Sequence, residues 1–168
     1  LNPTAGEKDA DPAQREGKML SNVFNRVARS CFYTIQKYGE PIMPLGSVSD
    51  EVLHDAKETI LKYEHAMYKF EFHTIMNLMD SYIRSANKFW AKNIKETENE
   101  EEKRTQTLID TLHMVKTAMT LMHPIAPRGT ELLCEYLGFD KSIWSWDNVF
   151  DTFTAVSYTH LRAHETCA

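Results

Sequence analysis

The longest uninterrupted amphipathic stretch of the sequence runs from Phe70 to Asn93, and it limits the possible folds more than any other feature. Its apolar residues recur three and four positions apart: Phe72, Ile75, Met76, Met79, Ile83, Ala86 and Trp90. This spacing is typical of an α-helix with one buried stripe, and no Gly or Pro interrupts it. At about 1.5 Å per residue, such a helix is long enough to cross a small domain. We therefore expect other helices to pack on Met76, Met79, Ile83 and Trp90.

Four further stretches have the same helical period, so the sequence predicts an all-α fold of five helices. A helix over 12–38 follows a possible cap at Asp11, ends at Gly39 and buries one stripe of residues: Leu20, Phe24, Val27, Ala28, Cys31, Phe32 and Ile35. Ser49 and Asp50 are candidate caps for a helix over 49–67. The last two helices are expected over 101–122, with a stripe of Leu108, Leu112, Val115, Met119 and Met122, and over 128–137, before Gly138.

The segments between these helices are expected to be irregular. Residues 40–46 contain two prolines, and residues 94–104 are acidic and poor in apolar side chains. After Gly138, Trp144, Trp146, Val149 and Phe150 alternate with polar residues in an irregular or short-helix segment. Residues 154–168 follow no helix or strand pattern and resemble read-through of a cloning adapter, so we expect a non-native tail.

Length and composition indicate one globular domain and exclude several classes of protein. The chain has 168 residues and a formal net charge of −5, so it is not a uniformly basic nucleic-acid coat. Cys31, Cys134 and Cys167 are odd in number and far apart, which is typical of a reducing cytoplasm rather than a disulfide scaffold. No apolar run reaches the roughly 18–20 residues of a membrane span. The chain begins at Leu1, and we expect a piece of a longer protein with residues 1–11 as a linker.

The sequence contains no motif for nucleotide or metal chemistry. It has no Gly-rich phosphate loop and no nucleophile elbow. A di-iron site in a helical bundle needs Glu-x-x-His pairs on facing helices. Glu71 and His73 are two residues apart, and Glu64 and His65 are adjacent, so neither pair shares a helix face. We therefore expect no bound metal and no catalytic residue in this chain.

Two groups of polar residues are candidates for contact with RNA. Asn22 and Arg26 are four residues apart and share a face of the first helix, opposite Phe24 and Val27. An amide and a guanidinium can bond base edges and phosphate, but the pair is equally compatible with an ordinary solvated face. Lys88, Lys92 and Lys95, with Arg84 one turn earlier, form a basic edge that either follows a phosphate backbone or faces solvent. Trp90 falls on the apolar stripe, so we expect it in the core rather than stacked on a base.

Three segments, in this order and spacing, resemble a known family. They are LSNVFNRV at 20–27, YIRSANKFW at 82–90 and MHPIAPRGTELLCEYLG at 122–138. Together they resemble the C-terminal anticodon-binding domain of methionyl-tRNA synthetases, an α-helix bundle of class I enzymes, over about residues 12–153. The His-Pro-x-x-Pro turn at 123–127 is shared with the isoleucine, leucine and valine enzymes, whereas the first two segments are typical of the methionine branch.

The resemblance implies tRNA as the partner and assigns roles to particular residues. In that family the first-helix Asn and Arg contact anticodon bases, and they correspond here to Asn22 and Arg26. Charge and position, rather than the resemblance, lead us to expect that Arg84 and Lys88 meet phosphate, and Asn87 is expected to orient the helix packing around Asn22 and Arg26. The family has a Pro-Trp pair where this chain has Lys95-Glu96, so the stacking Trp is absent and anticodon reading is expected to be weaker or broader.

The resemblance also implies what this chain lacks. The family's His-Ile-Gly-His and Lys-Met-Ser-Lys-Ser motifs do not occur in it. They belong to a catalytic domain that would precede Leu1 and bind ATP and the amino acid, whereas this chain would carry no cofactor. The expected partners are tRNA and that upstream domain in the cytoplasm, without DNA or a membrane. The alternatives are the same domain of a valine, isoleucine, leucine or cysteine enzyme, a divergent paralogue, or a helical interaction module without RNA.

Overall fold

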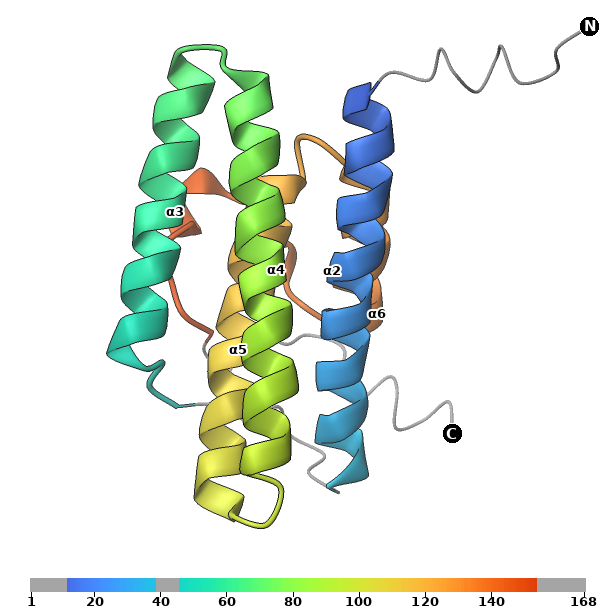
Figure 1. The fold of residues 1–168 in the computed structure, drawn as a ribbon, viewed down its shortest axis with the longest axis vertical. Coiled ribbons are helices and arrows are strands. Elements are labelled where there is room, and N and C mark those ends of the chain that lie inside the picture. The colour runs from blue at the N-terminus through green and yellow to red at the C-terminus, as the bar shows by residue number, and fades with distance from the viewer. Residues whose placement is uncertain (1–11, 39–45, 154–168) are drawn as a thin grey trace, which may run out of the picture.

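The computed structural model describes residues 12–38 and 46–153, and these form an all-helical bundle (Figure 1). Five α-helices follow one another along the chain: α2 (Pro12–Lys37), α3 (Asp50–Tyr68), α4 (Phe72–Glu96), α5 (Glu101–Met122) and α6 (Pro127–Leu137). Two short 3-10 helices, η1 (Lys141–Trp144) and η2 (Trp146–Asn148), complete the described part, which contains no strand. The predicted all-α fold of five helices is therefore confirmed, and the segment after Gly138 is short-helical as expected.

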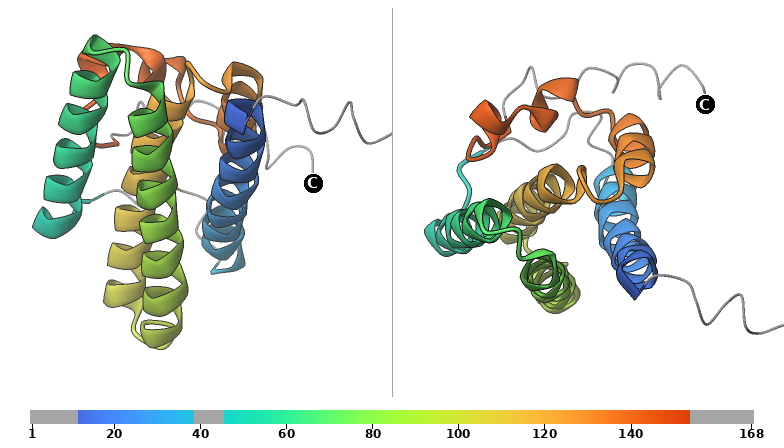
Figure 2. Two further views of the ribbon diagram at one scale, coloured as in Figure 1. Left: turned by 45° about the horizontal axis from the view of Figure 1, so that its top comes forward. Right: turned by 90° about the horizontal axis from the view of Figure 1, so that it is seen from above.

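The bundle is built around α5 rather than around α4. All sixteen residues from Thr107 to Met122 are buried, and seen from above α5 lies among the other helices and the 3-10 turns (Figure 2). The predicted stripe of α5 is in the core, but so is every other side of the helix. Threonines can be buried on these other sides because their hydroxyls find partners within α5. The hydroxyls of Thr107, Thr111 and Thr120 each donate to the carbonyl four residues earlier in the helix.

The long helix α4 packs one side on this core, as its apolar spacing predicts. Met76, Met79, Ile83 and Trp90 are all buried. Phe72 is an exception, because its side chain is 61% exposed although it falls on the same stripe. It stands at the first position of α4, beside the turn from α3. The helical period therefore predicted the correct face, but the packed part of that face begins only at Ile75.

The start of α3 is fixed by a contact with α5 instead of by a side-chain cap. Ser49 is the N-cap residue, but its side chain makes no cap hydrogen bond. Its hydroxyl donates to Asp110 Oδ2 at 2.6 Å, and its backbone N–H donates to Asp110 Oδ1 at 2.9 Å. The predicted caps thus correctly mark the helix boundary, while the hydroxyl serves a tertiary contact.

The His-Pro-x-x-Pro turn joins the last elements of the bundle. The His123 ring stacks on Trp144 of η1, with centroids 4.1 Å apart, and its Nε2 lies 3.1 Å from Glu131 Oε1 on α6. Nearby, the buried Lys116 ammonium donates to the carbonyl oxygens of Asn148 and Val149 at 2.7 and 3.0 Å. Burial lowers the pKa of Lys116 to about 8, an effect that the Asp151 carboxylate opposes. These contacts hold η1 and η2 against α5 and α6.

Candidate nucleic-acid interface

Helix α2 carries the two residues predicted to contact RNA on its outer surface. Phe24, Val27 and Cys31 are buried against the rest of the bundle. Because a helix repeats every 3.6 residues, positions 22 and 26 fall away from this stripe. The side chains of Asn22 and Arg26 are both exposed in the structure. The pair is therefore accessible to a ligand, while its predicted role in binding remains a prediction.

A hydrogen bond between two distant segments sets α2 against α4. The Trp90 indole N–H donates to Ser30 Oγ at 2.9 Å, and the two helices run in the same direction (Figure 1). Both rise 1.5 Å per residue, so Arg26 lies level with about Ala86. Arg26 is also four residues before Ser30, on the side of α2 that approaches α4. The structure thus places Asn22 and Arg26 beside the middle of α4. The sequence alone could not predict this neighbourhood.

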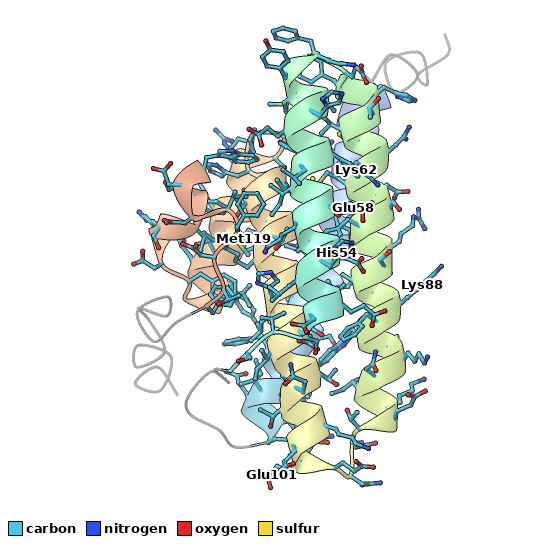
Figure 3. The ribbon with its side chains drawn as sticks, turned by 90° about the vertical axis from the view of Figure 1, so that its left-hand side faces the viewer. His54, Glu58, Lys62, Lys88, Glu101 and Met119 are labelled. Carbon is cyan, nitrogen blue, oxygen red and sulfur yellow. The ribbon has the colours of Figure 1, made fainter. Side chains whose placement is uncertain are left out.

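The three candidate residues of α4 differ in their surroundings. Arg84 is exposed, and its Nε donates to both carboxylate oxygens of Asp80, at 2.9 and 3.1 Å. Asn87 is half-buried, and its amide donates to the Ile83 carbonyl at 3.2 Å, a bond within its own helix. Lys88 is exposed and points away from the bundle (Figure 3). We call the surface formed by Asn22, Arg26, Arg84, Asn87 and Lys88 the α2–α4 face.

The helices that form this face also contain two long stretches without acidic residues. Between Gly17 and Gly39 the sequence has no Asp or Glu, and it has four cations: Lys18, Arg26, Arg29 and Lys37. Between Ser81 and Lys95 there is again no acidic residue, and there are four cations: Arg84, Lys88, Lys92 and Lys95. All eight cationic side chains are exposed. The net negative charge of the chain therefore comes from other elements, chiefly α3 and the α4–α5 turn.

The separation of charge is a signal that reasoning from motifs missed. The total charge of −5 was weak evidence against a nucleic-acid partner. Counting charge helix by helix would have found the two acid-free runs, because a basic stripe on one face is the electrostatic footprint of a nucleic-acid interface. Arg29 belongs to this stripe but is partly engaged, since its guanidinium lies 5.4 Å from the centre of the Tyr136 ring.

The chemistry of the α2–α4 face suits binding and positioning. Guanidinium, ammonium and amide groups supply hydrogen-bond donors for phosphate and base edges. In the described residues, no group of three or more His, Cys, Asp or Glu side chains is arranged to hold a metal ion. Trp90 is buried, as predicted, so its ring is not available for stacking on a base. Lys95 and Glu96, at the positions where the resembling family has Pro-Trp, are both exposed.

Comparison with known proteins agrees with this description. Residues 49–161 match the family described as the anticodon-binding domain of tRNA ligase. The chain is also 26% identical, over 147 residues, to a methionine–tRNA ligase of Enterococcus faecalis. That alignment covers 83% of this chain and 21% of the relative, so the chain spans about a fifth of the length of that enzyme. No solved structure matches the chain significantly.

The family match covers the later helices of the bundle but not the first. The family match begins at residue 49, so α2 and the roles of Asn22 and Arg26 lie outside it. Across the described ranges, no helix is both long enough and apolar enough to cross a membrane. The match nevertheless covers more than half of the chain, including α3 to α6 and the His-Pro-x-x-Pro turn. The chain therefore belongs to the family of anticodon-binding domains of class I tRNA ligases.

Proposed function

We propose that this chain holds the anticodon arm of a methionine tRNA on the α2–α4 face. By holding the anticodon arm, it would position the acceptor end for a catalytic domain elsewhere in the same cytoplasmic enzyme. That domain would bind ATP and methionine and would carry out the aminoacylation. This chain would then contribute affinity and selectivity for tRNA without a catalytic residue or a cofactor of its own.

The observation that carries the proposal is the exposure of Asn22 and Arg26 on a stretch of α2 that has no acidic residue. Phosphate contacts give most of the affinity of such an interface, whereas contacts to base edges give the sequence preference. Arg26 has no ion-pair partner among the described residues, so its guanidinium is free to bond a base or phosphate. Arg84 must first release Asp80, and we therefore expect it to contribute less than Arg26 or Lys88.

The methionine assignment is supported by the alignment with the Enterococcus faecalis enzyme and by the Asn22–Arg26 pair. It is a finer statement than family membership, because the domain is shared by several class I enzymes. Binding of the chain to transcripts of the methionine, valine, isoleucine, leucine and cysteine tRNAs separates these possibilities. Equal binding of the methionine transcript and the other transcripts would contradict the assignment and leave the family membership intact.

The test of the site is substitution of Arg26 by Ala, followed by binding of the methionine tRNA transcript at two salt concentrations. We expect the affinity of Arg26→Ala to fall about 5- to 150-fold, the range for loss of one good base contact. Lys88→Ala should weaken binding of every tRNA similarly and reduce the salt dependence by about one phosphate contact. Arg128→Ala, which removes an exposed arginine at the start of α6, is the matched control and should bind like the unmodified chain.

The outcomes of this experiment separate binding from structure. Equal affinities for Arg26→Ala, Arg128→Ala and the unmodified chain would overturn the proposed site. Both substituted positions are exposed, so the thermal unfolding temperature should not change, and a drop in it would mean that Arg26 supports the fold instead. A helical interaction module without RNA would show no salt-sensitive tRNA binding in any variant.

A further inference from the structure

Tyr33 is a large aromatic side chain that α2 leaves uncovered. It is 66% exposed, whereas Phe24 and Phe32 of the same helix are buried. Tyr33 lies seven residues after Arg26, which is two helical turns, so the two side chains share the outer surface of α2. Within the described residues, the Tyr33 ring has no aromatic or cationic partner and its hydroxyl has no hydrogen bond. Most of the Tyr33 side chain is therefore accessible to a ligand.

The charged residues near Tyr33 in the sequence distinguish it from the other exposed aromatic residues. Each of the others has an acidic residue within three positions in the sequence: Tyr68, Phe70, Phe72, Tyr136, Trp146 and Phe150. Tyr33 has no Asp or Glu within six positions, and Arg29 and Lys37 each lie four residues away. An RNA strand that follows α2 would therefore meet no repulsion from a carboxylate of this helix close to the Tyr33 ring.

The spacing along α2 fits a strand of nucleic acid lying beside the helix. Seven residues at 1.5 Å each place Tyr33 about 10 Å from Arg26 along the helix axis. Stacked nucleotides are about 3.4 Å apart along one strand. A base at Tyr33 would therefore be about three nucleotides from a base held by Arg26. Exposed aromatic rings beside cations are the usual stacking platforms for unpaired bases.

Building on the proposed function, we propose that the Tyr33 ring stacks on an unpaired base of the tRNA anticodon loop. The stacked base would lie about three nucleotides from the base contacted by Arg26, toward the carboxyl end of α2. Stacking on one aromatic ring is worth about 1–3 kcal/mol and tolerates any base, since every base has a flat face. Tyr33 would thus add affinity for the loop with little sequence preference of its own.

The proposal is tested with three substitutions of Tyr33 and binding of the methionine tRNA transcript. Tyr33→Ala and Tyr33→Leu should weaken binding about 5- to 150-fold, because neither side chain has an aromatic face. Tyr33→Phe should bind like the unmodified chain, since the hydroxyl is not required for stacking. Tyr68→Ala is the matched control, because Tyr68 is 85% exposed at the α3–α4 turn, away from the α2–α4 face, and its loss should not change the affinity.

A second measurement identifies the base that the ring contacts. A set of transcripts is prepared, each lacking the base at a different position of the anticodon loop. At one position, loss of the base should weaken binding to the unmodified chain but should not weaken binding to Tyr33→Ala any further. Such non-additivity is expected only for groups in contact. Normal binding of Tyr33→Ala, or equal binding of Tyr33→Leu and Tyr33→Phe, would overturn the stacking role. If Arg26→Ala remains weak in that case, the proposed function stands without Tyr33, whereas normal binding of both variants overturns both.

Discussion

His113 is a histidine that the fold keeps uncharged. Its side chain is 2% exposed on α5, and none of the described residues forms a hydrogen bond with its Nδ1. Burial, with a smaller contribution from the neighbouring Lys116 cation, lowers the pKa of His113 to about 4. The ordinary pKa of histidine is about 6.5, so the unfolded chain takes up a proton at this position well before the folded chain does.

We predict that this difference makes the domain sensitive to acid between pH 6.5 and pH 4. In that window the unfolded state binds more protons, so the free energy of unfolding rises with pH and is lost as the pH falls. A shift of this size corresponds to a loss on the order of 3 kcal/mol. Urea unfolding at pH 7 and pH 4.5 measures it, and His113→Leu should remove most of the difference. The exposed substitution His73→Gln should leave the difference unchanged, and an unaltered pH dependence in His113→Leu would contradict the assignment.

Phe70 occupies a backbone position that normally belongs to glycine. Its φ is 58°, the only positive φ of a non-glycine residue in the described part. The backbone N–H groups of Phe70 and Glu71 donate to the carbonyls of Met67 and Ala66, which is the Schellman pattern for ending a helix. Gly138 has the same role after α6, with a φ of 70° and the corresponding two hydrogen bonds.

We therefore predict opposite effects on stability for introducing a glycine at position 70 and for removing the glycine at position 138. Phe70→Gly should raise the free energy of unfolding by about 1 kcal/mol, because a side chain in the left-handed region costs about 1–2 kcal/mol and the ring is mostly exposed. Gly138→Ala should lower it by about the same amount. Phe70→Ala keeps the strained backbone without the ring and should resemble the unmodified chain in urea unfolding. A destabilised Phe70→Gly would show that the ring packs against something.

At the scale of the helices, α5 shows what amphipathic spacing predicts correctly and what it does not. Its predicted bounds, 101–122, agree with the observed Glu101–Met122. The spacing of its leucines and methionines predicted one buried stripe, yet the helix is enclosed on all sides. The predicted stripe did not include the other buried positions, because they mix polar with apolar side chains and follow no helical period. They are Thr107, Ile109, Asp110, Thr111, His113, Met114, Lys116, Thr117, Ala118, Thr120 and Leu121. Asp110 and Lys116 are buried with partners 61 and 32 or 33 residues away.

The contact between α5 and the start of α3 gives a prediction for this pair of helices. Asp110 is 4% exposed and accepts bonds from Ser49 and from the Gln106 amide. Asp110→Asn replaces one acceptor with a donor, leaving a buried group unpaired, so we expect a loss of about 1–3 kcal/mol in the free energy of unfolding. Ser49→Ala should cost less, and the two losses should not add in the double variant. Glu102→Gln, at the exposed start of α5, is the control; purely additive losses would disprove the coupling.

For the molecule as a whole, the fold could be predicted from the sequence more fully than the candidate site. Pro and Gly positions and the helical period predicted five helices, and the period also predicted that Asn22 and Arg26 would be exposed. The period could not show which helix lies beside Arg26. That neighbourhood depends on the contact of Trp90 with Ser30, sixty residues apart. The prediction for Phe72 failed for the same reason, because burial depends on the neighbouring element as well as on the helix face.

The uneven distribution of charge has a consequence for how a ligand would arrive. Carboxylates collect on α3 and at the α4–α5 turn, while the outer sides of α2 and α4 carry only cations over long runs. The domain therefore has an electric dipole moment in spite of its negative total charge. A polyanion within about one Debye length, ~8 Å at physiological salt, would exert a torque on the domain. This torque would turn the α2–α4 face toward the polyanion before the two surfaces touch. Orientation during encounter would thus depend as much on where carboxylates are missing as on where lysine and arginine stand.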